Sequence, residues 1–355
     1  MTFDAVLTTH LMSNLHGGLK TGTKALANLD LTADWQGPDG WQAFAYVEVN
    51  SKDGFSASYV GDQQYVSNID LTPGVHLAEA WVQKTSAAGH FVTMAGFVSA
   101  TDVFDVQDVG ALFLNSSHAL GVEFSQSGLS CVPRSALGIV TTWHPGNALH
   151  LHAGLFDAVG GDPDHPGAFI AAKFSRHTGL QYVLEAEKDF TGGYIKLGHW
   201  SNTVKADALD GAGAARRASG TYAQLSLALT HEQDDPDSAQ GLSAWLRAGN
   251  ADEQVLAVDR YAGAGLVYTG LLTGRDHDRF GFAIARARFG RAYRATVEDR
   301  VTTETTYELT YQYEVRPGFI LQPDAQYVQR PAGSHAIRDA LVVGLQVRLG
   351  LEAFR

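Results

Sequence analysis

Side chains that could bind a polar solute recur at every second position of short segments in this chain. In TYELTYQYEVR (306–316), glutamate, threonine, glutamine and arginine alternate with tyrosine, leucine and valine. Guanidinium, carboxylate and amide groups hydrogen-bond polar solutes, and aromatic rings cover their apolar faces. The candidates whose phase predicts a shared polar interior are Arg247, Arg286, Arg288, Arg316, Arg348, Glu79, Glu185, Glu308, Glu314, Gln312 and Gln326, with Trp81 and Trp245 as the aromatic candidates.

No pattern of catalytic residues accompanies these groups. The sequence has no glycine-rich phosphate loop before a helix and no nucleophile elbow, so we expect no enzyme, no catalytic residue and no cofactor. His150 and His152 share one face, but a third ligand at a sensible spacing is lacking, which favours hydrated wall histidines over a metal site. The acidic turns 162–164 and 234–237 could bind Ca²⁺, although solvated loop tips are the favoured interpretation.

Composition narrows the class of protein. The 355 residues carry a net charge of −12 without a basic stripe, so no nucleic-acid partner is expected, and the single cysteine excludes an internal disulfide. No apolar run reaches the roughly 18 residues of a membrane-spanning helix, but a spanning strand needs only about 9–11 residues with alternate ones apolar. Met1–Asp4 begins no signal peptide, which favours a mature or trimmed chain over a cytoplasmic one.

Period-two alternation predicts strands from one end of the chain to the other. The seventeen candidate segments are 3–13, 18–30, 41–50, 75–84, 91–99, 136–144, 148–157, 168–175, 180–188, 193–202, 222–230, 241–249, 260–270, 280–289, 306–316, 319–328 and 338–354. Bacterial single-chain barrels have even strand numbers, so we expect sixteen strands and one loop among these segments. No linker or helical period divides the chain, which predicts one domain over residues 1–355.

Alternation alone fits both a soluble sandwich and a membrane barrel, and three features favour the barrel. Charges follow one another on consecutive polar faces, as with Glu308, Asp324 and Arg348, which suits a hydrated lumen better than a packed core. Tyrosine and tryptophan gather near segment ends, which is typical of interfacial girdles; these residues are Trp35, Trp41, Trp143, Trp200, Tyr307, Tyr313 and Tyr327. The last segment is a long amphipathic strand that can pair with the first. The predicted fold is all-β: a closed antiparallel transmembrane β-barrel.

Several stretches in order also resemble a known family. They are LHGGLKTG (15–22), HLAEAWVQ (76–83), FLNSS (113–117), YIKLGHWSNT (194–203), GLVYTGLLTGRDHD (265–278), TYELTYQYEVRPGFILQPDAQYVQRPAG (306–333) and DALVVGLQVRL (339–349). Together they resemble the carbohydrate-selective porins, the OprB-like family. The resemblance implies a barrel of the bacterial outer membrane that passes glucose and similar sugars by facilitated diffusion. It also implies a loop folded inward as a constriction, for which 102–124 is the candidate by position.

On this interpretation the polar candidates would meet a mono- or oligosaccharide in a water-filled, charge-lined pore. Arginine, carboxylate and amide groups would bind the sugar hydroxyls, and the tryptophans would cover its CH faces. The remaining partners would be outer-membrane lipid and lipopolysaccharide, around a monomer or a homo-oligomer. Two alternatives stay open: a general or anion-preferring porin, and a soluble secreted glycan-binding β-protein.

Overall fold

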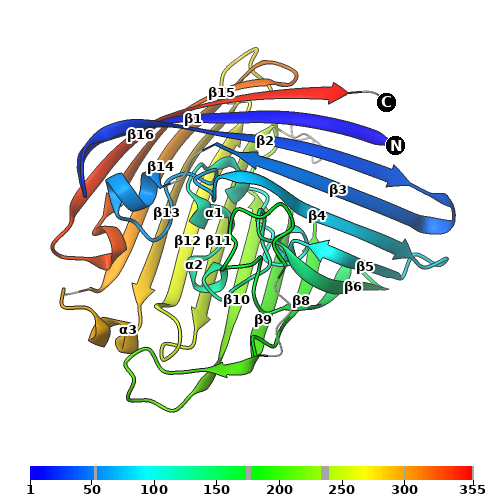
Figure 1. Ribbon diagram of the computed structural model, residues 1–355. Coiled ribbons are helices and arrows are strands. Elements are labelled where there is room, and N and C mark those ends of the chain that lie inside the picture. The colour runs from blue at the N-terminus through cyan, green and yellow to red at the C-terminus, as the bar shows by residue number, and fades with distance from the viewer. Residues whose placement is uncertain (52–53, 173–176, 233–239, 300, 354–355) are drawn as a thin grey trace.

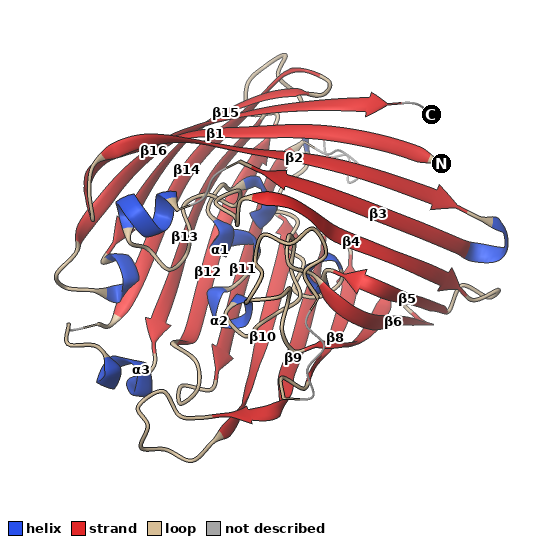
Figure 2. Ribbon diagram, viewed as in Figure 1, coloured by secondary structure: helices blue, strands red, loops and turns tan. Residues whose placement is uncertain are grey.

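The computed structural model describes residues 1–51, 54–172, 177–232, 240–299 and 301–353, and within them a single antiparallel sheet closes on itself (Figures 1 and 2). The strands are β1 (Thr2–Gly18), β2 (Gly22–Gln36), β3 (Trp41–Asn50), β4 (Gly74–Thr85), β5 (Phe91–Val98), β6 (Ala136–Gly146), β7 (Leu149–Asp157), β8 (Leu180–Phe190), β9 (Gly193–Ala206), β10 (Arg216–Ala228), β11 (Gly241–Ala251), β12 (Val258–Thr269), β13 (Arg279–Phe289), β14 (Thr303–Arg316), β15 (Phe319–Gln329) and β16 (Arg338–Ala353). Each strand pairs with its sequence neighbours, so the order of the strands in the sheet follows their order in the chain.

Sixteen of the seventeen predicted segments form strands. The exception is 168–175: its residues 168–172 form no strand, and the remainder lies outside the described residues. The acidic turn at 234–237 also lies outside the described residues. The predicted pairing of the last strand with the first is confirmed by the register Leu7↔Leu349 and Leu11↔Leu345, which closes the barrel.

The two walls of the barrel differ in polarity as the membrane prediction requires. Leu11, Leu184 and Leu246 on the outer wall are 52%, 49% and 53% exposed, whereas Glu308 and Gln326 on the inner wall are 0% and 1% exposed. Apolar side chains therefore cover the surface that would meet lipid, and the inner wall is polar. This arrangement contradicts the soluble glycan-binding alternative, in which the same apolar face would be buried in a core.

Most of the short turns and both termini lie at one end of the barrel (Figure 1), and aromatic residues lie in the strand ends there. Trp35 and Trp41 flank the turn at 37–40, and Phe91 stacks on Trp143 with ring centroids 6.1 Å apart. Short turns are periplasmic in bacterial barrels, so this end faces the periplasm and the longer connections face outward. Trp200 was expected in a girdle, and that expectation is wrong: its side chain is fully buried inside the barrel.

Two long connections at the outer end fold back into the barrel. They are residues 54–73, between β3 and β4, and residues 99–135, between β5 and β6. Figure 2 shows the short helices α1 (Ser116–Ala119) and α2 (Val122–Ser125) of the second connection inside the ring of strands. No helix in the described ranges is long and apolar enough to cross a membrane.

Leu184→Arg tests the assignment of the two walls, because Leu184 lies at the middle of β8 on the outer face. A charge at the lipid midplane costs about 2–4 kcal/mol, so we expect a lower free energy of unfolding in liposomes by that amount. The control is His152→Arg on the neighbouring strand, which adds the same side chain to the inner wall within reach of Glu187. Urea titration of the folded fraction measures both variants, and equal losses would contradict the assignment.

Candidate functional site

The inner wall of β8–β15 is covered by the connection 99–135, here called the inserted loop. Its candidate portion from the sequence, 102–124, lies within it. The wall under the loop is built from small residues and leaves little space: a Cβ on Gly281 would lie 2.8 Å from Leu112 Cδ2. Ala283, Ala285 and Ala287 continue this surface and are fully buried. The loop therefore packs directly against the backbone of the wall.

A buried ion-pair triad joins the inserted loop to β11. The Arg247 guanidinium donates from Nε to Asp105 Oδ1 at 2.9 Å, from Nη2 to Asp105 Oδ2 at 2.6 Å and from Nη2 to Glu123 Oε1 at 2.8 Å. All three side chains are 0% exposed. Tyr222 and Tyr261 place their rings 5.4 and 5.0 Å from the guanidinium carbon. Two loop carboxylates are thus held by one wall cation in a site closed to water.

Wall carboxylates and amides bind the loop backbone at further points. Glu308 accepts hydrogen bonds from the amides of Leu114 and Asn115 at 2.6 and 3.0 Å. Glu185 accepts from the amide of Asp105 at 2.8 Å, and Glu79 accepts from the amide of Ser99 at 3.1 Å. Because buried backbone groups need a partner, these contacts fix the course of the loop.

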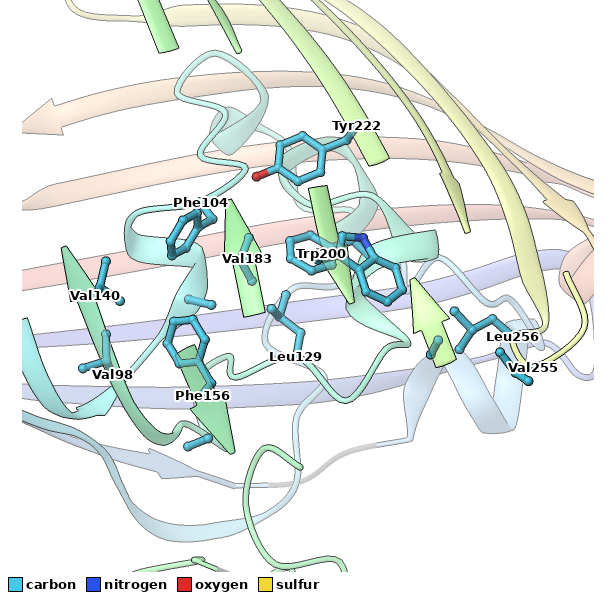
Figure 3. Close-up of a cluster of buried hydrophobic side chains, with 14 residues drawn as sticks. Val98, Phe104, Leu129, Val140, Phe156, Val183, Trp200, Tyr222, Val255 and Leu256 are labelled. Atoms are coloured by element: carbon cyan, nitrogen blue, oxygen red, sulfur yellow. The ribbon is translucent and has the colours of Figure 1, made fainter. Parts of the chain in front are cut away.

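Apolar contacts complete the docking of the inserted loop. Phe124 of α2 stacks on Trp200 of β9 with ring centroids 5.3 Å apart, within the cluster shown in Figure 3. Trp245 of β11 packs with Leu112 and Phe113 in a second cluster. Both tryptophans are therefore held between the loop and the wall and do not face the lumen.

The connection 54–73 docks on the strands β14, β16 and β1 by the same means. Val66 and Ile69 pack with Met12 of β1 and Val342 of β16. Glu304 of β14 accepts hydrogen bonds from the amides of Gln63 and Gln64 at 2.8 and 3.0 Å. Burial raises the pKa of Asp62, in the same connection, to about 6.

The predicted site residues fall into three groups. Those buried in the inner wall, most of them in contact with the inserted loops, are Arg247, Glu79, Glu185, Glu308, Gln312, Gln326 and Trp245. Those on the inner wall with solvent contact are Arg316, Arg348, Glu314 and Trp81. Arg286 and Arg288 form the third group, because they lie on the outer wall.

The inward phase predicted for Arg286 and Arg288 is wrong. On β13 the two arginines lie on the same face as Phe280, Phe282 and Ile284, which points outward. The opposite face carries the small residues that contact the inserted loop. The inner wall is apolar at this strand because it meets protein there instead of water. The usual association of polar residues with the lumen therefore fails on β13.

The inner wall of β2–β4 carries polar side chains that are partly exposed, whereas most of the predicted polar candidates on the other strands are buried. Tyr46 donates to Asp30 at 2.6 Å and Gln42 to Asp34 at 2.6 Å, all four side chains being partly exposed. Beside them Phe44 stacks on Trp81, with ring centroids 5.2 Å apart and an interplanar angle of 28°. Of these residues, only Trp81 was predicted from the sequence. Alternation along 24–34 could have identified Asp30 and Asp34, which share the polar face of that segment.

Histidine and carboxylate groups meet on the inner wall of β7 and β8. His152, Glu185 and Glu187 place one ligand atom each within 4.8 Å of the others, a grouping that could hold a divalent cation. Lys196 Nζ lies 3.3 Å from Glu187 and supplies positive charge to the same carboxylate. His144 and His150 contact each other through their Nδ1 atoms at 2.6 Å nearby. The third ligand that the sequence did not reveal is therefore present, and Lys196 beside Glu187 opposes the binding of a cation. The absence of a metal from this cluster stays a prediction.

Arg247→Ala tests the triad. Removing one partner of a buried ion pair costs about 3–5 kcal/mol, because Asp105 and Glu123 would remain buried without their cation. We expect faster amide exchange across 99–135 and a larger single-channel conductance. Arg275→Ala, which removes the more exposed pair with Asp278, is the control and should change neither. Unchanged exchange in Arg247→Ala would show that the triad does not hold the loop.

The docking of 54–73 should weaken as the pH rises. Because the pKa of Asp62 is raised from 3.8 to about 6, the folded state favours the protonated carboxyl. The stabilisation from the protonated Asp62 carboxyl is complete below its pKa in the unfolded chain, 3.8, and is lost as the pH rises through about 6. Amide protection factors in 54–73, which correct the exchange rates for their intrinsic dependence on pH, should fall from about pH 4 to about pH 8 in the native protein and much less in Asp62→Asn.

Comparison with known proteins places the chain in a family. A sequence model described as the carbohydrate-selective porin, OprB family, matches residues 12–351. Porin B of Pseudomonas aeruginosa is 27% identical over 129 residues, covering 32% of this chain and 28% of Porin B. The aligned part spans less than a third of the length of the curated relatives it matches.

Solved structures show the same fold. The high-pH structure of Pseudomonas putida OprB superposes with a TM-score of 0.83 at 19% identity, covering 98% of this chain and 94% of that protein. The outer-membrane channel DcaP of Acinetobacter baumannii superposes with a TM-score of 0.59 at 8% identity, covering 98% and 96%. The fold and the family indicate an outer-membrane channel and not an enzyme. With a family match over nearly its whole length and a closed barrel that holds an inserted loop, the chain belongs to the carbohydrate-selective porins of the OprB family.

Proposed function

We propose that the protein conducts small neutral sugars, glucose among them, by facilitated diffusion through the lumen beside the inserted loop. One observation carries the proposal beyond the family: the inner wall of β2–β4 presents a stacked aromatic pair next to carboxylate and amide groups, all partly exposed. A monosaccharide has apolar CH faces and a rim of hydroxyl groups, so this arrangement complements both.

Each part of this wall has a distinct task. The Phe44–Trp81 pair offers an apolar surface to one sugar face. Asp34 and Gln42 offer hydrogen-bond acceptors and donors to hydroxyl groups. Arg348 of β16 lies in the electrostatic range of Asp30, so opposite charges face the same water column. Partial solvent exposure keeps each contact weak, which lets the sugar leave as well as enter.

The inserted loop narrows the path that remains. Asp102 and Asp108 are exposed on the loop, while the charges that hold it are buried. Arg316 and Glu314 lie toward the periplasmic end of β14. The alternative of a general or anion-preferring porin predicts a current that does not respond to sugar.

Single-channel recording with a glucose titration tests the proposal. We expect glucose to reduce the current in a saturable way, and Trp81→Ala to weaken its apparent affinity about fivefold, since an aromatic contact contributes about 1 kcal/mol. Trp35→Ala is the control, because Trp35 is exposed on the outer wall. A current that never responds to glucose or its oligomers would overturn the sugar assignment and favour a general porin, and reversal potentials would then reveal any anion preference.

A further inference from the structure

The outer wall of β10–β13 changes character toward the outer end of the barrel. Leu225, Leu246 and Ile284 continue the apolar band. Two residues further along each strand, the register aligns Ala223, Ala248, Ala262 and Arg286 across the four strands, and beyond them Arg260 pairs with Arg288. The wall therefore passes from large apolar side chains to small ones and then to arginines.

The small side chains leave a hollow in this wall, here called the arginine groove. It consists of a cavity of about 1060 Å³ that Arg260, Arg286 and Arg288 line, and an adjoining apolar cavity of about 530 Å³. Ala223, Ala248, Ala262 and Arg286 line both cavities, so the two are continuous. The groove thus has a basic end toward the outer face of the membrane and an apolar end toward its centre.

The basic end of the groove carries three arginines against two carboxylates, Asp259 and Glu253, and Glu253 pairs with Arg291. Arg288 forms an ion pair with Asp259. Within the described part of the chain, Arg260 and Arg286 are exposed and form no ion pair. Thr303, which also lines the groove, buries its hydroxyl oxygen without a hydrogen-bond partner among the described residues. Two guanidinium groups without an ion-pair partner among the described residues thus face a single space.

A guanidinium at the edge of an apolar membrane band needs an anion or water, and its fork of donors matches phosphate oxygens in a bidentate geometry. Arg260 lies near the start of β12 and Arg286 near the end of β13, at the outer end of the barrel, where we expect the outer-leaflet headgroups. We propose that the arginine groove binds a phosphate-bearing lipid of the outer leaflet, with its phosphate on Arg260 and Arg286 and an acyl chain on the alanine surface. A second copy of the chain would fit poorly, because a symmetric contact would bring these cations together.

Native mass spectrometry of the detergent-purified protein tests this binding, with diphosphoryl lipid A and its dephosphorylated form as probes. We expect at least a tenfold preference for the phosphorylated probe in the native protein. Arg260→Ala combined with Arg286→Ala should remove that preference. Ala262→Trp should weaken binding although both arginines remain, because it fills the junction between the basic and apolar cavities.

Two controls match these variants. Arg316→Ala removes an exposed arginine from the opposite end of the barrel, and Ala25→Trp adds the same bulk to the outer wall of β2. Both should bind lipid A as the native protein does, and heat-modifiable gel mobility should show that every variant is folded.

Three outcomes would overturn the proposal. Equal binding of the two lipid A forms would show that the groove does not recognise the phosphate group. Full competition by inorganic phosphate, with no effect of Ala262→Trp, would identify a free-phosphate site. A dimer or trimer that the double arginine variant dissociates would identify the groove as a contact between copies of the chain.

Discussion

The structure depends on one constraint: inside a bilayer, every backbone amide and carbonyl must find its partner within the protein. The pairing of β1 with β16 meets that constraint by leaving no open edge, and it also defines two walls that face different solvents. The alternation of side chains, the apolar outer surface and the enclosed column of water all follow from this closure. A shift of one residue in any register would exchange the two faces of a strand.

Closure alone would produce a wide, symmetric tube, and the inserted loop removes that symmetry. On β8–β15 the inner wall uses its charges to bind the loop, so Arg247, Glu185 and Glu308 work as structural groups. On β2–β4 similar side chains stay open to the lumen. Buried charge on one arc thus provides rigidity, and exposed charge on the other provides contact with solute.

The even strand number of bacterial barrels predicted sixteen strands, and the long amphipathic last segment predicted closure. Alternation of residues located the strands, because period two is a local property of the sequence. It was insufficient to separate lumen-facing side chains from those under the loop. Asp105 and Arg247 are 142 residues apart, and Leu114 and Glu308 are 194 apart, so no local pattern connects them. The error at Arg286 and Arg288 had a local signal: both share their parity with Phe280 and Phe282, opposite a run of glycine and alanine.

The distance along the chain between the loop and its partners also orders the steps of biogenesis. The inserted loop follows β5, yet its carboxylates and amides bind β8, β11 and β14, which emerge later from the ribosome and from any translocation machinery. Until those strands are in place, Asp105 and Glu123 have no cation. The loop therefore docks as a late step of assembly, and the pore acquires its narrow cross-section only once the ring of strands is almost complete.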